Sequence, residues 1–195
     1  MLAAVALAAL GLGSGPALHD RPLEWAVAGV GEGARTLVIQ PGIGGGCDEG
    51  RPRVAVREGR GRIRVSVTIR SAEGPDVACP AIAHYHEPVT VRLDAPVAGR
   101  AIGGPQRSGR PGFVLDSRPP QPGPTVAVPR VAGLRAADAR RALCAWRIRA
   151  RGATGAATVA VQRPRAGRPV TIPREAAPER CSGLPARPAV TLRPR

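Results

Sequence analysis

The chain has 195 residues, including 25 Gly and 22 Pro, and only 2% of its residues are aromatic. This composition argues against a single large core and predicts one or two small modules with cores of Val, Ile, Leu and Ala. The formal net charge is +15, and every basic side chain is Arg because the sequence contains no Lys. A charge of this size favours anionic partners through long-range attraction.

Residues 1–17 predict an export signal. Leu2–Leu12 is a continuous apolar run, and small residues follow it up to Ala17, after which cleavage is expected. The run is too short to cross a bilayer comfortably, so no integral membrane span is expected. We therefore expect a secreted or cell-envelope protein in an extracytoplasmic compartment.

Four cysteines favour the same compartment. Cys47 and Cys79 lie in the first half of the chain, and Cys144 and Cys181 lie in the second. Three pairings are possible, of which one bridge in each half is the simplest, and such bridges require an oxidising environment. The sequence has no C-x-x-C spacing, so a zinc site or a thioredoxin-type redox motif is poorly supported.

Residues 36–102 predict an all-β first module. Along Arg62–Arg70, Ile and Val alternate strictly with polar residues, which is typical of a strand with one buried face. The alternation continues upstream across a Gly-rich turn, so residues 52–70 predict a hairpin. Thr36–Gln40 and Val89–Leu93 add two further strands. One polar and one apolar face on each strand predict an antiparallel sheet or a small sandwich.

A bridge between Cys47 and Cys79 would clip the two ends of this hairpin, because Cys47 precedes it and Cys79 follows it. With its paired cysteines and the later run Val89–Pro96, this stretch resembles a small β module that recurs in exported bacterial proteins of unknown role. The resemblance implies no particular function.

Residues 103–125 lack periodicity and are rich in Pro and Gly, which predicts an extended linker. A second module is expected at residues 126–195. Arg135–Trp146 predicts a helix with one apolar face, and strand-like segments follow at Val159–Gln162 and Val190–Leu192. The fold class expected for the whole chain is α+β.

Three pieces follow one another in the second module. They are Val-Pro-x-Val-x-Gly at Val128–Gly133, Ala-x-x-Ala-Leu at Ala139–Leu143, and Val-x-x-Gln-x-Pro-x-Ala-Gly at Val159–Gly167. This order resembles the PASTA family over residues 126–195. The resemblance implies a small helix packed on a three-stranded sheet, and a role in binding peptidoglycan fragments or related wall polymers outside the bacterial membrane.

The second module departs from the family pattern at two places. Arg147 stands where the family usually has Gly after the helix, and an insertion that contains Cys181 precedes the last strand. Cys144, on the helix, is expected to tether this insertion. The module is a single copy, whereas the family usually occurs as tandem repeats.

The positive charge is concentrated in the second module. Residues 36–105 hold nine Arg against seven acidic residues, whereas residues 126–195 hold fifteen Arg against three. Guanidinium groups grip carboxylates and phosphates through two parallel hydrogen bonds. Trp146 is either a stacking platform for a sugar or a core residue, and its helical spacing with Leu143 favours the core. The candidate ligand-binding residues are Arg140, Arg141, Arg147, Arg149, Arg163, Arg165 and Trp146.

Other functions have less support in the sequence. His84 and His86 would suit a metal ion only if further ligands converged on them, so no metal site is predicted. No Ser lies in a Gly-x-Ser-x-Gly motif, so neither catalytic residues nor a cofactor is predicted, and the protein is not expected to be an enzyme. The export features and the few aromatics argue against nucleic acid.

The expected function is therefore binding of peptidoglycan or an anionic wall polymer by a protein that is monomeric. The alternatives are a scaffold that contacts another envelope protein without a small ligand, and nonspecific binding of polyanions through the arginine surface.

Overall fold

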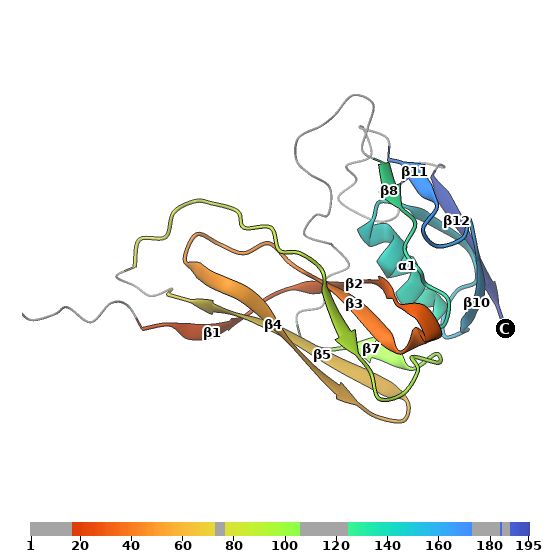
Figure 1. Cartoon of the computed structure of the whole chain (residues 1–195), viewed down its shortest axis with the longest axis horizontal. Helices are drawn as coiled ribbons and strands as arrows, with labels where there is room; N and C mark the ends of the chain where they lie inside the picture. The colour runs from red at the N-terminus through yellow and green to blue at the C-terminus, as the bar shows by residue number, and fades with distance from the viewer. Residues whose placement is uncertain (1–16, 73–76, 106–124, 173–183, 185–187) are drawn as a thin grey trace, which may run out of the picture.

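The computed structural model describes residues 17–72, 77–105, 125–172, 184 and 188–195. Strands predominate, and the described residues include one α-helix and one short 3-10 helix (Figure 1). The elements in chain order are β1 His19–Pro22, β2 Trp25–Val30, η1 Glu32–Ala34, β3 Thr36–Pro41, β4 Asp48–Glu58, β5 Arg62–Ser71, β6 Val89–Arg92, β7 Ala101–Gly103, β8 Thr125–Ala127, α1 Ala136–Ala145, β9 Arg149–Gly152, β10 Val159–Arg163, β11 Pro169–Thr171 and β12 Ala189–Pro194.

Strands β1 to β7 form a small sandwich of two sheets, here called the N-terminal sandwich. In one sheet β5 pairs with β4 along one edge and with β1 and β7 along the other, and the second sheet has the order β2-β3-β6. All of these pairs are antiparallel except β5–β7. The predicted antiparallel sandwich and its β4–β5 hairpin are confirmed.

The alternation in β5 explains which face of its sheet is buried. Ile63, Val65, Val67 and Ile69 are each at most 2% exposed, whereas the arginines between and beside them are exposed. These apolar side chains belong to the same buried cluster as residues of β2 and β3 in the other sheet. Their removal from water is the main favourable term in holding the two sheets together.

The predicted disulfide between Cys47 and Cys79 is present, with a Cα–Cα distance of 5.1 Å. Cys47 directly precedes β4, and its carbonyl accepts a hydrogen bond of 3.1 Å from the amide of Ala72, just after β5. The bridge therefore joins the open end of the β4–β5 hairpin to the loop that begins at Val77.

The remaining elements, β8 to β12 with α1, form the C-terminal module. Its main sheet has the order β10-β12-β9, in which β10–β12 is antiparallel and β9–β12 is parallel, while β8 and β11 form a separate two-stranded ribbon. Helix α1 contacts β9 and β12. The predicted helix on a three-stranded sheet is confirmed.

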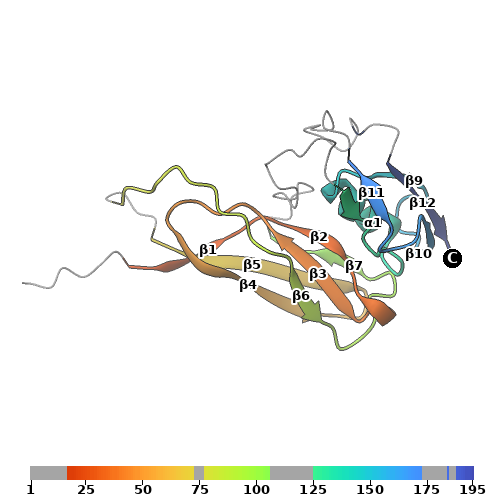
Figure 2. The ribbon, with the colours of Figure 1, turned by 45° about the horizontal axis from the view of Figure 1, so that its top comes forward.

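Helix α1 is covered on a second side by β2 of the N-terminal sandwich, as Figures 1 and 2 show. All six residues of β2 are buried. Hydrogen bonds cross this junction, including Val30 N–H to the Arg130 carbonyl at 2.8 Å and Gly99 N–H to the Gly133 carbonyl at 2.9 Å. The side chain of Arg135 also donates to the Gly99 carbonyl.

The buried apolar residues form one continuous cluster from Leu23 to Leu192. The sequence argued against a single large core, and that expectation was wrong because it treated each module as if it buried its own faces alone. Residues 106–124 of the predicted linker lie outside the described residues, and its two ends lie in β7 and β8. No helix within the described ranges is long and apolar enough to cross a membrane.

Candidate anion-binding face

The exposed face of the β10-β12-β9 sheet gathers arginines from all three strands. In register, Arg163 of β10 lies beside Thr191 of β12, which lies beside Arg151 of β9. Arg149 occupies the same face two residues before Arg151, and Arg193 lies two residues after Thr191. We call Arg149, Arg151, Arg163 and Arg193 the basic sheet face.

The local sequence explains this arrangement. Side chains alternate between the two faces of a strand, and Val190 and Leu192 of β12 point inward, where they are at most 1% exposed. Their neighbours Thr191 and Arg193 must therefore point outward, and both are exposed. The inward side of β12 packs against α1, so Thr191 and Arg193 occupy the side turned away from the helix.

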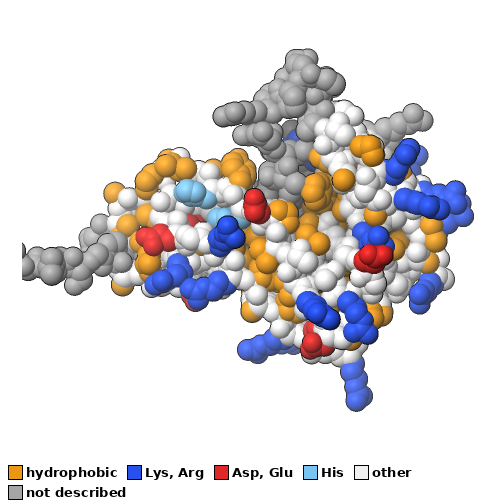
Figure 3. Space-filling model, in the orientation of Figure 1, with side chains coloured by type: hydrophobic (Ala, Val, Ile, Leu, Met, Phe, Trp, Pro, Cys, Tyr) orange, Lys and Arg blue, Asp and Glu red, His pale blue; other side chains and the backbone are white. Residues whose placement is uncertain are grey.

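The charge on this face is positive. The described part of the C-terminal module contains one acidic side chain, Asp138, which is 4% exposed and lies on α1. Basic side chains gather over the part of the molecule where β10 and β12 lie (Figure 3). The face therefore presents several guanidinium groups without an acidic residue from the described part of the module.

Arg140, a predicted ligand residue, makes three hydrogen bonds to backbone carbonyls. Its Nε donates to the carbonyl of Ala153 at 3.0 Å, and its two terminal nitrogens donate to the carbonyls of Ala150 at 3.2 Å and Gly152 at 3.0 Å. These hydrogen bonds fasten α1 to β9 and its following turn. Three of the five N–H groups of this guanidinium are therefore used within the module.

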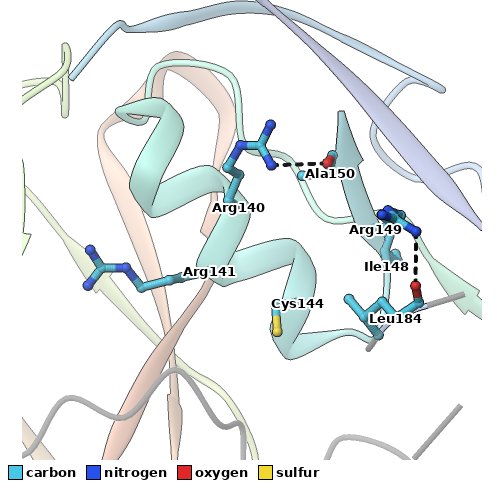
Figure 4. A pocket seen from close by; sticks show the side chains of 7 residues that line it. All are labelled: Arg140, Arg141, Cys144, Ile148, Arg149, Ala150 and Leu184. Atoms are coloured by element: carbon cyan, nitrogen blue, oxygen red, sulfur yellow. Dashed lines mark hydrogen bonds between the residues drawn. The ribbon is translucent and has the colours of Figure 1, made fainter. Parts of the chain in front are cut away.

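A cavity of about 350 Å³ lies between the end of α1 and the start of β9. Arg149 donates a hydrogen bond of 3.2 Å to the carbonyl of Leu184 at its edge, while Arg141 points away from Arg140 and Arg149 (Figure 4). Apolar side chains contribute much of the wall. The residues that line the cavity are Arg140, Arg141, Cys144, Ile148, Arg149, Ala150 and Leu184.

Two further predicted arginines lie away from the basic sheet face. Arg147 follows α1 with a φ of 56°, in the left-handed region where Gly is favoured, and burial lowers the pKa of its guanidinium. Arg165 lies in the turn after β10, beside a cavity that Arg163 and Arg168 also line. This turn extends the positive charge beyond the end of β10.

Trp146 lies at the junction of the two modules. Its side chain is half-buried and packs against the apolar core, and its indole N–H donates a hydrogen bond of 2.9 Å to the carbonyl of Ala28 in β2. Both properties are those of a core residue with a satisfied polar group. The ring is therefore committed to the contact between α1 and the N-terminal sandwich.

Arg151 and Arg193 were not among the candidate ligand-binding residues predicted from the sequence. Arg149-Ala150-Arg151-Gly152 contains only one apolar side chain, so no strand was predicted there. The spacing of Arg149 and Arg151 by two residues, and of Val190 and Leu192 around Thr191, carried the signal. Once β9 is known to be a strand, the alternation assigns both arginines to one face.

The second pair of cysteines was also predicted as a bridge. Cys144 is disulfide-bonded, and Cys181 lies outside the described residues. The tether that Cys144 was expected to provide for the insertion therefore falls partly outside the described part of the chain.

A smaller polar cluster lies near the disulfide of the N-terminal sandwich. Arg21 forms an ion pair with Asp48, whose side chain is 1% exposed. Burial opposes ionisation of Asp48, but hydrogen bonds from Arg21 and from the Gly45 amide, together with the charge of Arg21, lower the pKa of this carboxyl. The Nε2 atom of His86 lies near Asp48, shielded from solvent and without a hydrogen-bond partner.

Neither His84 nor His86 lies in a strand. His84 forms an isolated bridge with Gly44 and is exposed, whereas His86 is half-buried. Within the described residues, no group of three or more His, Cys, Asp or Glu side chains is placed to hold a metal ion.

Comparison of the chain with protein-family models, with curated proteins and with solved structures finds no match.

Proposed function

We propose that this protein is an exported cell-envelope protein that binds peptidoglycan or an anionic wall polymer through the basic sheet face. The observation that carries the proposal is the convergence of Arg149, Arg151, Arg163 and Arg193 on the exposed side of one sheet. The cavity beside Arg149 would accept a smaller group of the ligand at the edge of this face.

The resemblance to the PASTA family supports the wall polymer as the ligand class. Two of the pieces that carry the resemblance contact each other here: the side chain of Gln162 accepts a hydrogen bond of 2.6 Å from Val131 N–H and donates one of 2.8 Å to the carbonyl of Pro129. Gln162 therefore joins the Val-Pro-x-Val piece to β10, as expected if these pieces define one small fold.

The export features support the compartment. The predicted signal at residues 1–17 would direct the chain out of the cytoplasm, and the disulfide between Cys47 and Cys79 is of the kind that persists in oxidising environments. Peptidoglycan and anionic wall polymers carry carboxylates or phosphates, which guanidinium groups bind through two hydrogen bonds.

The test is co-sedimentation of the full oxidised chain with purified peptidoglycan, before and after its anionic polymers are stripped, at low and physiological salt. We expect the Arg163→Thr/Arg193→Thr variant to be retained less than the native chain at physiological salt. Retention that survives stripping would assign peptidoglycan as the ligand, and retention lost on stripping would assign the anionic polymer.

The matched control is Arg92→Thr/Arg130→Thr, which removes the same charge from exposed positions away from the basic sheet face. Equal loss in both variants would mean that only net charge matters, and would overturn the proposal in favour of nonspecific polyanion binding. No retention of the native chain at either salt concentration would overturn it in favour of a scaffold role.

A further inference from the structure

A second group of arginines lies on the N-terminal sandwich, outside the module that carries the basic sheet face. On the outer side of the β4–β5 sheet, Arg57 is directly opposite Arg64 in the antiparallel register, and Arg62 is two residues from Arg64 on the same face. All three side chains are exposed. We call Arg57, Arg62 and Arg64 the hairpin arginines.

Their position follows from the pattern of β5. Ile63 and Val65 face the core and are at most 1% exposed, so Arg62 and Arg64 must face solvent. Residues directly opposite in an antiparallel pair have Cβ atoms about 5 Å apart, and residues two apart on one strand are about 7 Å apart. Three guanidinium groups are thus held within reach of a single extended ligand.

The arginines in the other half of the same face have acidic partners, which the hairpin arginines lack among the described residues. Arg53 forms an ion pair with Asp20 at 3.6 Å, and Arg70 lies opposite both Asp20 and Glu49 in register. The guanidinium groups of the hairpin arginines make no hydrogen bond or ion pair with the described part of the chain. Glu58, the nearest acid in sequence, is instead paired with Arg100 at 2.8 Å.

Like charges directly opposite on neighbouring strands destabilise a sheet, so the pairing of Arg57 with Arg64 opposes folding of the unliganded protein. Small residues surround them on this face, with Ala55 opposite Ser66 and Gly103 opposite Arg64. Among the described residues, these neighbours offer no aromatic ring on which a nucleobase would stack.

From this arrangement we propose that the hairpin arginines form a second binding site, for a linear polyanion without bases whose phosphate or carboxylate groups repeat along an extended chain. Each guanidinium would hold one anionic group through two hydrogen bonds. This site lies on the N-terminal sandwich and the basic sheet face lies on the C-terminal module (Figures 1 and 2), so the two groups of arginines can be changed independently.

The test compares two double variants of the full chain. Arg57→Thr/Arg64→Thr removes the opposed pair, and Arg53→Thr/Arg70→Thr removes the same charge from the same strands and face, where acidic partners are present. Both are made in the Arg163→Thr/Arg193→Thr background, so that the basic sheet face contributes less. Titration calorimetry with poly(glycerol phosphate) and, separately, with polygalacturonate gives the affinity at several salt concentrations.

We expect the first variant to bind at least one of the two polymers roughly tenfold more weakly at 0.1 M salt, with a smaller dependence of affinity on salt, because two charge contacts are lost. The control variant should bind within about twofold of its parent. Which polymer responds tells whether phosphate or carboxylate is the group recognised, and equal binding to duplex DNA would overturn the preference for a polymer without bases.

Thermal unfolding of the ligand-free variants provides a second measurement. We expect the melting temperature to rise in Arg57→Thr/Arg64→Thr, because the like-charged pair is removed, and to fall or stay unchanged in the control. Equal weakening of binding in both variants, or no weakening in the first, would overturn the site. Either result would leave the basic sheet face and its wall-binding test unaffected.

Discussion

Arg147 occupies a backbone conformation that its side chain disfavours. Its φ of 56° lies in the left-handed region, where a residue with a Cβ atom is strained by roughly 1 kcal/mol relative to Gly. The pattern of the PASTA family, which the second module resembles in sequence, usually has Gly at this position after the helix. The left-handed conformation explains in physical terms why Gly would suit it.

Replacing Arg147 with Gly is therefore expected to raise the free energy of unfolding by about 0.5–1 kcal/mol. Arg147→Ala is the control, because it removes the same side chain but keeps the Cβ atom. Denaturant unfolding of the two variants isolates the backbone effect as the difference between them. An Ala variant as stable as the Gly variant would contradict the explanation.

His86 makes stability depend on pH near neutrality. Burial lowers the pKa of His86 from its ordinary value of 6.5, and the charges of His84 and Arg21 act in the same direction, while Asp48 opposes them. The folded protein thus binds this proton less readily than the unfolded chain. The free energy of unfolding should fall as pH drops through 6.5, until it levels off below the folded pKa.

We expect denaturant midpoints to be lower at pH 5 than at pH 7 in the native chain, and this difference to shrink in His86→Gln. His84→Gln, which changes a neighbouring exposed histidine, should keep most of the difference. The lowered pKa values of Asp48 and Glu58 add their own loss of stability only at more acidic pH, because those carboxyls ordinarily titrate near 3.8 and 4.5. The same pH dependence in both His variants would contradict the assignment to His86.

At the scale of elements, helix α1 is held between two sheets, and Trp146, the residue that directly follows the helix, makes part of this contact. The pairing of β2 with β3 shifts register between Val27 and Gly29, which leaves Ala28 outside the regular ladder. The indole N–H of Trp146 donates to the Ala28 carbonyl. Trp146 therefore supplies a hydrogen bond that the irregular strand lacks.

Trp146→Phe is expected to lower the free energy of unfolding by about 1–2 kcal/mol, because the buried Ala28 carbonyl loses its donor. Retention on peptidoglycan should be unchanged, since the ring belongs to the junction. Thermal unfolding and co-sedimentation on the same sample check both halves of the prediction. A variant with native stability but weaker retention on peptidoglycan would contradict this assignment and indicate that Trp146 stacks on a sugar.

The elements that could be predicted from the sequence are those whose own residues carry a regular pattern. β5 has four apolar residues at alternate positions, and α1 has Ala and Leu at helical spacing, so both were expected nearly at their observed ends. β2 was not expected, because Trp-Ala-Val-Ala-Gly-Val is buried on every side and has no alternation. Its structure depends on α1, which lies more than 100 residues later.

The candidate site, too, could be predicted only in part, because some of its residues depend on contacts between distant elements. Arg149 and Arg163 were expected from charge alone, and the structure places them on one face with Arg151 and Arg193. Arg140 could not be assigned from sequence, because its three hydrogen bonds go to backbone carbonyls that only the docking of β9 brings close. Charge patterns locate a basic module, whereas strand register decides which arginines share a face.

At the scale of the whole molecule, the continuous core predicts one cooperative unfolding unit instead of two. The Cys47–Cys79 bridge closes a loop of sequence separation 32, which corresponds to about 3.5–4 kcal/mol in the chain-entropy model. Because β2 belongs both to the N-terminal sandwich and to the covering of α1, loss of this bridge should also weaken the C-terminal module.

The Cys47→Ala/Cys79→Ala variant tests this coupling. Unlike a reducing agent, the variant removes this bridge without breaking the disulfide of Cys144. Amide hydrogen exchange should show that α1 loses protection in parallel with β5. The free energy of unfolding should fall by about 3.5–4 kcal/mol, the contribution expected from the bridge. Protection of α1 that stays at its native level while β5 exchanges faster would show that the two modules unfold independently.

The double covering of β2 also constrains the order in which the chain becomes folded during synthesis. A nascent chain that has emerged only as far as residue 105 contains every strand of the N-terminal sandwich, but it lacks α1 and the segment at Arg130 that bonds to Val30. The apolar side of β2 and its unpaired edge would then face solvent, and such edges pair readily with other chains. Protection of this strand must wait until Trp146 has been made, so three quarters of the protein exists before its first module is closed.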